Sequence, residues 1–249
     1  MFKKETYIQR REALKKAVGS GLLLFLGNDE AGCNYEDNTY PFRQDSTFLY
    51  FFGLPYAGLT AIIDVDENKE IIFGDELTMD AIVWMGTQPT LHEKSEAAGI
   101  TNVQPSGQVA TYLKSALKKG QTIHYLPSYR AEHKIKRWSL LGIEPGTEKP
   151  SVAFIRGVVN LRNYKTDEEI EKACNVTADM HLRAMRLVRP GIRECEVAAA
   201  IQEVAASHNY GLSFPIIATV NGQTLHNHDH GNMVKSGDLF LVDAGAETE

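Results

Sequence analysis

The apolar run at residues 22–26, Leu-Leu-Leu-Phe-Leu, constrains the fold of this chain more than any other stretch. It follows a polar segment with helical spacing at 4–17 and a Gly-Ser-Gly break at 19–21. A run this short cannot cross a bilayer, and its flanks favour a buried strand. A helix followed by a buried strand predicts an α/β fold.

The same alternation continues through the first half of the chain. Residues 60–73 contain two apolar runs around a polar turn and predict a hairpin, and 122–126 predicts a short strand. A basic helix is expected at 130–142, and strands are expected at 151–155 and at the aromatic block 48–53. Together these patterns predict one α/β domain with a mixed sheet.

The second half begins with a different pattern. Thr166 and Glu169 form a capping box that opens a long helix, and Arg-Pro-Gly at 189–191 ends it. A second helix is expected at 194–209, followed by a buried strand in Asp-Leu-Phe-Leu-Val-Asp-Ala-Gly. The predicted domains are residues 1–158 and 159–249. Because the chain stops directly behind an apolar strand, we expect it to be the first part of a longer protein.

Composition limits the partners and the location of the protein. With 43% hydrophobic residues, 23% charged residues and a net charge of −6, the chain is typical of a soluble globular protein. An acidic balance argues against nucleic acid or an anionic membrane as a partner and favours small molecules or peptides. The N-terminus has no signal-like apolar core, so we expect a cytoplasmic protein with its three cysteines as reduced, buried thiols.

The segment Thr-Leu-His-Asn-His-Asp-His-Gly-Asn places His226, His228 and His230 at alternate positions, with Asp229 between the last two. If extended, the three imidazoles share one face and two of them can hold a metal. The spacing differs by one residue from the His-x-His-x-Asp-His pattern of metallo-β-lactamase-type hydrolases. The alternative is a polar loop whose histidines lie in solvent.

Asp243 ends the apolar run Leu-Phe-Leu-Val and is followed by Ala-Gly-Ala. A carboxylate at the end of a buried strand is costly unless it is paired or bound to a metal. Hard metals such as Mn²⁺ accept carboxylates, but a two-metal hydrolase needs several of them. Asp243 therefore indicates either one ligand of a metal site or a residue that caps a turn.

Five segments together resemble the Xaa-Pro aminopeptidases, also called aminopeptidase P, in order and in context. They are Tyr-Pro-Phe-Arg-Gln-Asp-Ser-Thr-Phe-Leu-Tyr-Phe-Phe-Gly-Leu (40–54), Asn-Tyr-Lys-Thr-Asp-Glu-Glu-Ile-Glu-Lys-Ala (163–173), Val-Arg-Pro-Gly-Ile-Arg-Glu-Cys-Glu-Val (188–197), Leu-His-Asn-His (225–228) and Gly-Asp-Leu-Phe-Leu-Val-Asp-Ala-Gly-Ala-Glu (237–247). The resemblance covers nearly the whole chain. It implies a creatinase-like N-terminal α/β domain followed by the first part of an α+β metallopeptidase domain of the pita-bread fold.

The resemblance also implies an activity and two site residues. Enzymes of this family hydrolyse the bond between an N-terminal residue and a following proline, using two metal ions that are usually Mn²⁺, with Zn²⁺ or Co²⁺ as alternatives. Asp243 resembles the first of five metal ligands, and His226 resembles the histidine that lies over the site and helps bind substrate. The other four ligands have no counterpart in this chain, so the chain alone is expected to be inactive. A homo-oligomer is also implied.

Two departures from the family pattern leave the substrate open. Asn227 stands where the family often has Tyr, and the segment between Pro215 and His226 is short. Prolidase, the Xaa-Pro dipeptidase, shares both domains and is the first alternative. The second is a pita-bread relative without catalysis that binds peptides or histones, although the presence of both His226 and Asp243 argues against it.

Overall fold

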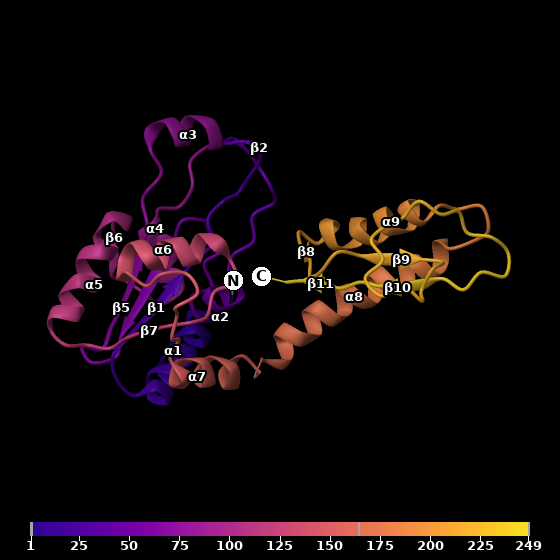
Figure 1. Ribbon diagram of the computed structural model, residues 1–249. Helices are drawn as coiled ribbons and strands as arrows, with labels where there is room; N and C mark the ends of the chain where they lie inside the picture. Colours follow the sequence, from indigo (N-terminus) through magenta and orange to yellow (C-terminus); the bar gives the residue numbers. More distant parts are fainter. Residues whose placement is uncertain (1, 164, 249) are drawn as a thin grey trace. The chain divides into compact units, whose positions relative to one another are not determined.

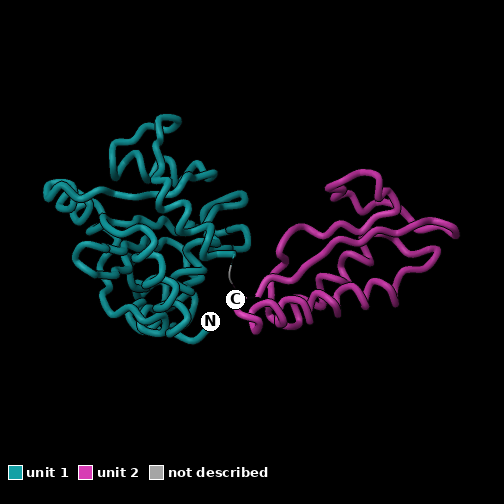
Figure 2. Tube along the Cα trace, turned by 90° about the horizontal axis from the view of Figure 1, so that it is seen from below, with its two compact units in different colours: residues 1–164 teal, residues 165–249 magenta. Residues whose placement is uncertain are grey.

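The computed structural model describes residues 2–163 and 165–248, and the chain divides into two compact units. Unit 1 comprises residues 1–164 and unit 2 residues 165–249 (Figure 2). The division follows helix α7 (Val152–Arg162), which packs against α1 (Lys4–Val18) within unit 1. Unit 1 therefore extends a few residues past the expected boundary at 158.

A five-stranded sheet forms the centre of unit 1 (Figure 1). Its strands run in the order β6 (Val103–Gln104), β5 (Lys69–Phe73), β4 (Thr60–Asp64), β1 (Leu22–Leu26) and β7 (Ile123–Tyr125). The β1–β4 and β4–β5 pairs are antiparallel, whereas β1–β7 and β5–β6 are parallel. The mixed sheet and the hairpin expected from the sequence are confirmed.

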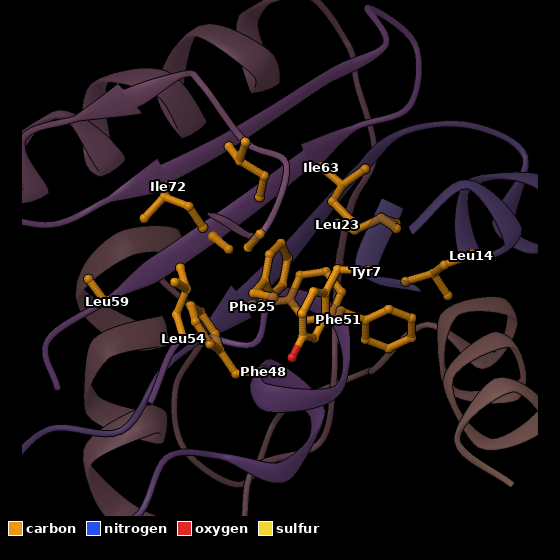
Figure 3. Close-up of a cluster of buried hydrophobic side chains, with 14 of the residues drawn as sticks. Tyr7, Leu14, Leu23, Phe25, Phe48, Phe51, Leu54, Leu59, Ile63 and Ile72 are labelled. Carbon is orange, nitrogen blue, oxygen red and sulfur yellow. The ribbon is translucent and has the colours of Figure 1, made fainter. Parts of the chain in front are cut away.

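The apolar run of β1 is explained by helices that cover both faces of the sheet. Leu23 and Phe25 point into a cluster with residues of α1, α2 (Ser46–Phe52) and α7, part of which Figure 3 shows. Leu22 and Leu24 point to the other face, into a cluster with α5 (Val109–Lys118) and the end of α6 (Ala131–Leu141). Successive residues of a strand face opposite sides, so a strand buried on both needs no polar alternation.

Two of the expected strands are helices, and both predictions were wrong for the same reason. The aromatic block at 48–53 lies in α2, where the Asp45 side chain accepts from two backbone N–H groups and Gly53 ends the helix at φ 62°. The segment at 151–155 opens α7, where the Ser151 hydroxyl accepts from the Phe154 N–H at 3.3 Å. Short apolar runs do not distinguish a buried strand from a buried helix, and the capping residues decide.

Six small elements of unit 1 lie outside the sequence predictions. They are β2 (Gly32–Tyr35), β3 (Asn38–Thr39), α3 (Met79–Met85), α4 (Leu91–Ala97), the edge strand β6 and the 3₁₀ turn at Ser106–Gln108 that precedes α5. Helix α3 stands away from the sheet (Figure 1) and has no buried residue, and Trp84 on it is 87% exposed.

In unit 2, two helices pack on short strand pairs. Helix α8 (Asp167–Leu187) begins with the predicted capping box, in which the Thr166 N–H donates to Glu169 Oε2 at 2.8 Å, and α9 (Glu194–Ser207) packs beside it. Strand β9 (Ile217–Thr219) pairs with β10 (Leu241–Asp243), and β8 (Gly211–Leu212) pairs with β11 (Ala246–Glu247). The strand predicted in this segment is shorter than expected, and the prediction that it is buried was wrong, because Leu241 and Asp243 are exposed and Leu239 before it is 89% exposed.

Two further sequence expectations concern the surface. Cys33, Cys174 and Cys195 are free but exposed, so the expectation of buried thiols was wrong. Within residues 2–163 and 165–248, no helix combines the length and the hydrophobicity that crossing a membrane requires.

A buried arginine joins α1 to three other parts of unit 1. The Arg11 side chain is fully buried, and its Nε donates to Glu70 Oε2 at 2.7 Å. Its Nη1 donates to the Phe51 carbonyl at 2.9 Å and its Nη2 to the Ala98 carbonyl at 3.0 Å. One guanidinium therefore satisfies two buried carbonyl groups as well as a carboxylate.

We expect Arg11→Ala to lower the free energy of unfolding of unit 1 by about 3 to 5 kcal/mol, because the carbonyls of Phe51 and Ala98 would remain buried without a donor. Urea unfolding followed by tryptophan fluorescence measures this, since Trp84 and Trp138 both lie in unit 1. Lys16→Ala, at an exposed position of the same helix, is the control. Equal effects of the two substitutions would contradict a special role for Arg11.

Candidate functional site

Asp243 lies at the end of β10, where it pairs with Ile217 across the strand pair. The preceding pair, Val242 and Ala218, belongs to the core that α8 and α9 cover. Because neighbouring residues of a strand face opposite sides, the Asp243 side chain points away from these helices, and the residue is exposed. Its carboxylate is therefore free to accept a ligand.

Helix α8 fixes the backbone directly after Asp243. The imidazole Nε2 of His181 lies 3.2 Å from the Ala244 carbonyl oxygen, and the Ala246 N–H donates to Thr177 Oγ1 at 3.1 Å. Both contacts come from one face of α8, at residues four apart. They hold the strand end that presents Asp243.

Asp243 is a single carboxylate, and one carboxylate alone does not make a metal site. Within the part of the chain that the structure describes, no group of three His, Cys, Asp or Glu side chains is placed to hold a metal ion. A carboxylate oxygen suits a hard divalent cation, but a single carboxylate does not complete a coordination sphere. The residues present are thus compatible with only one ligand of a metal centre.

The histidine segment forms an irregular loop, so the extended arrangement required for a three-histidine metal site is wrong. His226 is exposed and has a left-handed backbone with φ 57°, and the residues around it form turns. His228 is also exposed, whereas His230 is half-buried with its Nε2 3.1 Å from the Ile216 carbonyl oxygen. The alternative expectation was a polar loop whose histidines lie in solvent. It is correct for His226 and His228 but not for His230, which is half-buried.

Asn227 connects this loop to the strand pair that ends in Asp243. Its Nδ2 donates to Thr219 Oγ1 at 3.0 Å, and its Oδ1 accepts the Asp229 N–H at 3.0 Å. Thr219 is the residue of β9 that pairs with Leu241, two positions before Asp243. The loop that carries His226 and the strand that carries Asp243 therefore share one support, although no hydrogen bond joins their side chains among the described residues.

Glu194, which the sequence reading did not single out, is the buried acceptor beneath the loop. Its side chain is fully buried, and its Oε1 accepts the Thr219 hydroxyl at 2.9 Å and the Val220 N–H at 2.8 Å. Its Oε2 accepts both the N–H and the side-chain amide of Asn232 at 3.0 Å. Burial alone would raise the pKa of this carboxyl, but the four donated hydrogen bonds outweigh it and lower the pKa.

A shallow hollow beside the loop brings other residues together. Cys195 and Gln202 of α9, Pro215 and the imidazoles of His228 and His230 are among the residues that line it. The hollow is distinct from the strand end that bears Asp243, and its lining does not include His226.

Comparisons with known proteins agree with this architecture. Residues 7–124 match the family described as "Aminopeptidase P, N-terminal domain", and residues 168–249 match "Metallopeptidase family M24". The Xaa-Pro aminopeptidase of Escherichia coli is 28% identical over 98% of this chain and 59% of its own length. The Xaa-Pro dipeptidase of Rattus norvegicus is 26% identical over 95% of this chain and 51% of its own length.

A solved structure shows the same fold over both units. The aminopeptidase PepP of Pseudomonas aeruginosa matches with a TM-score of 0.85 and 22% identity, covering 99% of this chain and 59% of the other. The fold expected from the resemblance, an α/β N-terminal domain with part of the metallopeptidase domain behind it, is confirmed. The two family matches together cover most of the chain, in the order of an aminopeptidase P N-terminal domain followed by metallopeptidase family M24, and the chain spans little more than half of the length of these two relatives.

The stability of unit 2 should fall in acid, because the folded-state pKa of Glu194 is lowered from its ordinary value of 4.5. The contribution of its ionised carboxylate is complete above pH 4.5 and is lost as pH falls through the lower, folded-state pKa. We expect Glu194→Gln to lower stability at neutral pH by about 2 kcal/mol and to flatten the acid-side decline. Hydrogen exchange of α9 and β9 amides between neutral pH and pH 3 measures both effects, and an unchanged acid decline in the variant would contradict the assignment.

Proposed function

We propose that the whole protein is a metal-dependent Xaa-Pro aminopeptidase, which hydrolyses the bond between an N-terminal residue and a following proline. The observation that supports it best is the outward-facing carboxylate of Asp243 at a pinned strand end, within a segment of family M24. The proposed metal is Mn²⁺, with Zn²⁺ or Co²⁺ as alternatives. Divalent metals in such sites lower the pKa of a bound water to yield a nucleophile near neutral pH.

The proposed roles of this chain's residues follow from their positions. Asp243 would provide one of the ligands of a two-metal centre, and its exposure leaves the carboxylate available. His226 would face the substrate from the neighbouring loop and donate a hydrogen bond where negative charge develops at the scissile carbonyl. Its exposed imidazole and the shared support through Asn227 and Thr219 favour that role.

The 249-residue chain alone should show no Xaa-Pro cleavage, because one carboxylate cannot hold the metal ions. In the whole protein, we expect Asp243→Ala to lower kcat/KM by about 100-fold or more, and His226→Ala to lower kcat by about 100-fold. Release of free amine from an Ala-Pro-Ala peptide with added Mn²⁺ measures both. Asp238→Ala is the matched control, since this exposed carboxylate binds only the Lys235 N–H among the described residues.

Cleavage by the isolated chain that Asp243→Ala abolishes would overturn the requirement for further ligands. A whole protein that binds Xaa-Pro peptides but does not cleave them with Mn²⁺, Zn²⁺ or Co²⁺ would favour the non-catalytic binding module instead.

The second candidate is a dipeptidase, which the rat Xaa-Pro dipeptidase supports at an identity close to that of the aminopeptidase relative. The two activities differ in whether residues beyond proline are accepted. We expect the whole protein to cleave Ala-Pro-Ala and longer peptides at least as well as the dipeptide Ala-Pro. A strict preference for Ala-Pro in paired kcat/KM measurements would assign the dipeptidase.

The location and assembly form part of the same proposal. A cytoplasmic location is supported by three exposed, free cysteines, since reducing compartments keep thiols unpaired. A homo-oligomer is supported by α3, on which Met79, Val83 and Trp84 are 75%, 80% and 87% exposed. The net charge of −6 supports peptides rather than nucleic acid or a membrane as partners.

A further inference from the structure

We infer that Glu194, Thr219 and Asn227 form a one-directional chain of hydrogen bonds that positions His226, and that they act as positioning residues for the reaction. The catalytic part of this inference rests on the proposed function. The structural part concerns the loop alone and is tested separately. The chain begins at the buried carboxylate, passes through a strand and ends beside the histidine.

The first link is fixed because Glu194 can only accept. An ionised carboxylate has no proton to donate, so the Thr219 hydroxyl must donate to its Oε1, at 2.9 Å. The same hydroxyl oxygen accepts the Asn221 N–H and the Asn227 Nδ2, each at 3.0 Å. A hydroxyl has one proton and two lone pairs, so all of the hydrogen-bonding capacity of Thr219 is used.

The second link fixes the orientation of the Asn227 side chain. Because Thr219 Oγ1 faces Asn227 only as an acceptor, the amide group of Asn227 must present its NH₂ there and turn its Oδ1 the other way. That oxygen accepts the Asp229 N–H at 3.0 Å and closes a turn. The hydrogen-bond direction imposed by Glu194 is thereby passed to the backbone N–H of Asp229, two residues after Asn227.

The two oxygens of Glu194 also hold both ends of the loop. Oε1 accepts the Val220 N–H before it, and Oε2 accepts the Asn232 N–H behind it. Backbone bonds at the start of α9 add to this clamp, since the N–H groups of Glu194 and Cys195 donate to the carbonyls of Asn232 and His230 at 3.0 and 3.1 Å. The Glu194 carboxylate therefore holds the two ends of the loop, at Val220 and Asn232, and through Thr219 it also holds Asn227 inside the loop.

His226 has no hydrogen bond of its own side chain among the described residues, so its position depends on the backbone around it. Its backbone has φ 57°, a left-handed conformation that is uncommon for non-glycine residues, although histidine adopts it more readily than most. Its imidazole makes no hydrogen bond within the described residues, and the residue is exposed. Asn227, the next residue, therefore helps to set the backbone from which the His226 side chain departs.

The structural test uses the 249-residue chain and amide hydrogen exchange of residues 221–231. Asn227→Asp keeps the shape and the acceptor for Asp229 but removes the donor to Thr219, and Thr219→Val removes the hydroxyl. We expect each to speed exchange at 225–229 by about fivefold, the equivalent of one hydrogen bond of about 1 kcal/mol. Thr219→Ser should exchange as the unaltered chain does, because it keeps the hydroxyl.

His228→Ala is the matched control, since it removes an exposed imidazole from the same loop. Asn227→Asp also keeps the test independent of folding, because Asn227 lies in the loop and leaves in place the hydrogen bonds that Glu194 accepts from Thr219, Val220 and Asn232. Exchange in Asn227→Asp that equals the control, or a Thr219→Ser variant as fast as Thr219→Val, would overturn the inference.

The catalytic test uses the whole protein with Ala-Pro-Ala. We expect Asn227→Asp and Thr219→Val to lower kcat about tenfold with KM within twofold, since the loss falls on an interaction of the transition state. Thr219→Ser should restore kcat, which a merely structural loss would not predict. Faster loop exchange with an unchanged kcat would overturn the positioning role. If the unaltered whole protein had no peptidase activity, the proposed function would be refuted. The exchange experiment would then still test whether the hydrogen bonds hold the loop.

Discussion

The hydrogen bonds accepted by the buried carboxylate of Glu194 are the interaction on which the candidate site depends. Apolar packing of α8 and α9 on the strands can place β9 and β10, but it cannot define an irregular loop of polar residues. Arg11 has the corresponding role in unit 1 with the opposite charge, where its donors join α1 to three separate segments. In each unit, one charged group with a single hydrogen-bonding direction joins segments that lie far apart in the sequence.

Much of the architecture could be predicted because it follows from local pattern. The run at 22–26, the hairpin at 60–73 and the Thr166–Glu169 capping box were each interpreted correctly, since apolar periodicity and capping chemistry are properties of neighbouring residues. The segments at 48–53 and 151–155 were taken for strands because their apolar runs were weighed without the caps at Asp45 and Ser151. The exposed helix α3 lies in a segment for which the sequence analysis predicted no element.

In the candidate site, too, features that depend on neighbouring residues could be predicted and features that depend on distant residues could not. Asp243 could be located at a strand end from sequence, whereas its role as a metal ligand and the role of His226 came from family resemblance and remain proposals. Glu194 could not be recognised, because a glutamate in the first turn of a helix is ordinarily a solvated residue that favours the helix dipole. Its burial depends on Thr219, Val220 and Asn232, which lie 25 or more positions away and reach it only in the folded chain.

The bonds that His181 and Thr177 make to Ala244 and Ala246 have a consequence for strand register. Strands β9 and β10 share only three residue pairs, too few to exclude a slip by themselves. A slip of one position would exchange the two faces of β10, burying the charge of Asp243 beneath α8 and α9 and turning Val242 outward. By holding the next residues in place, α8 decides on which side of the sheet the carboxylate emerges.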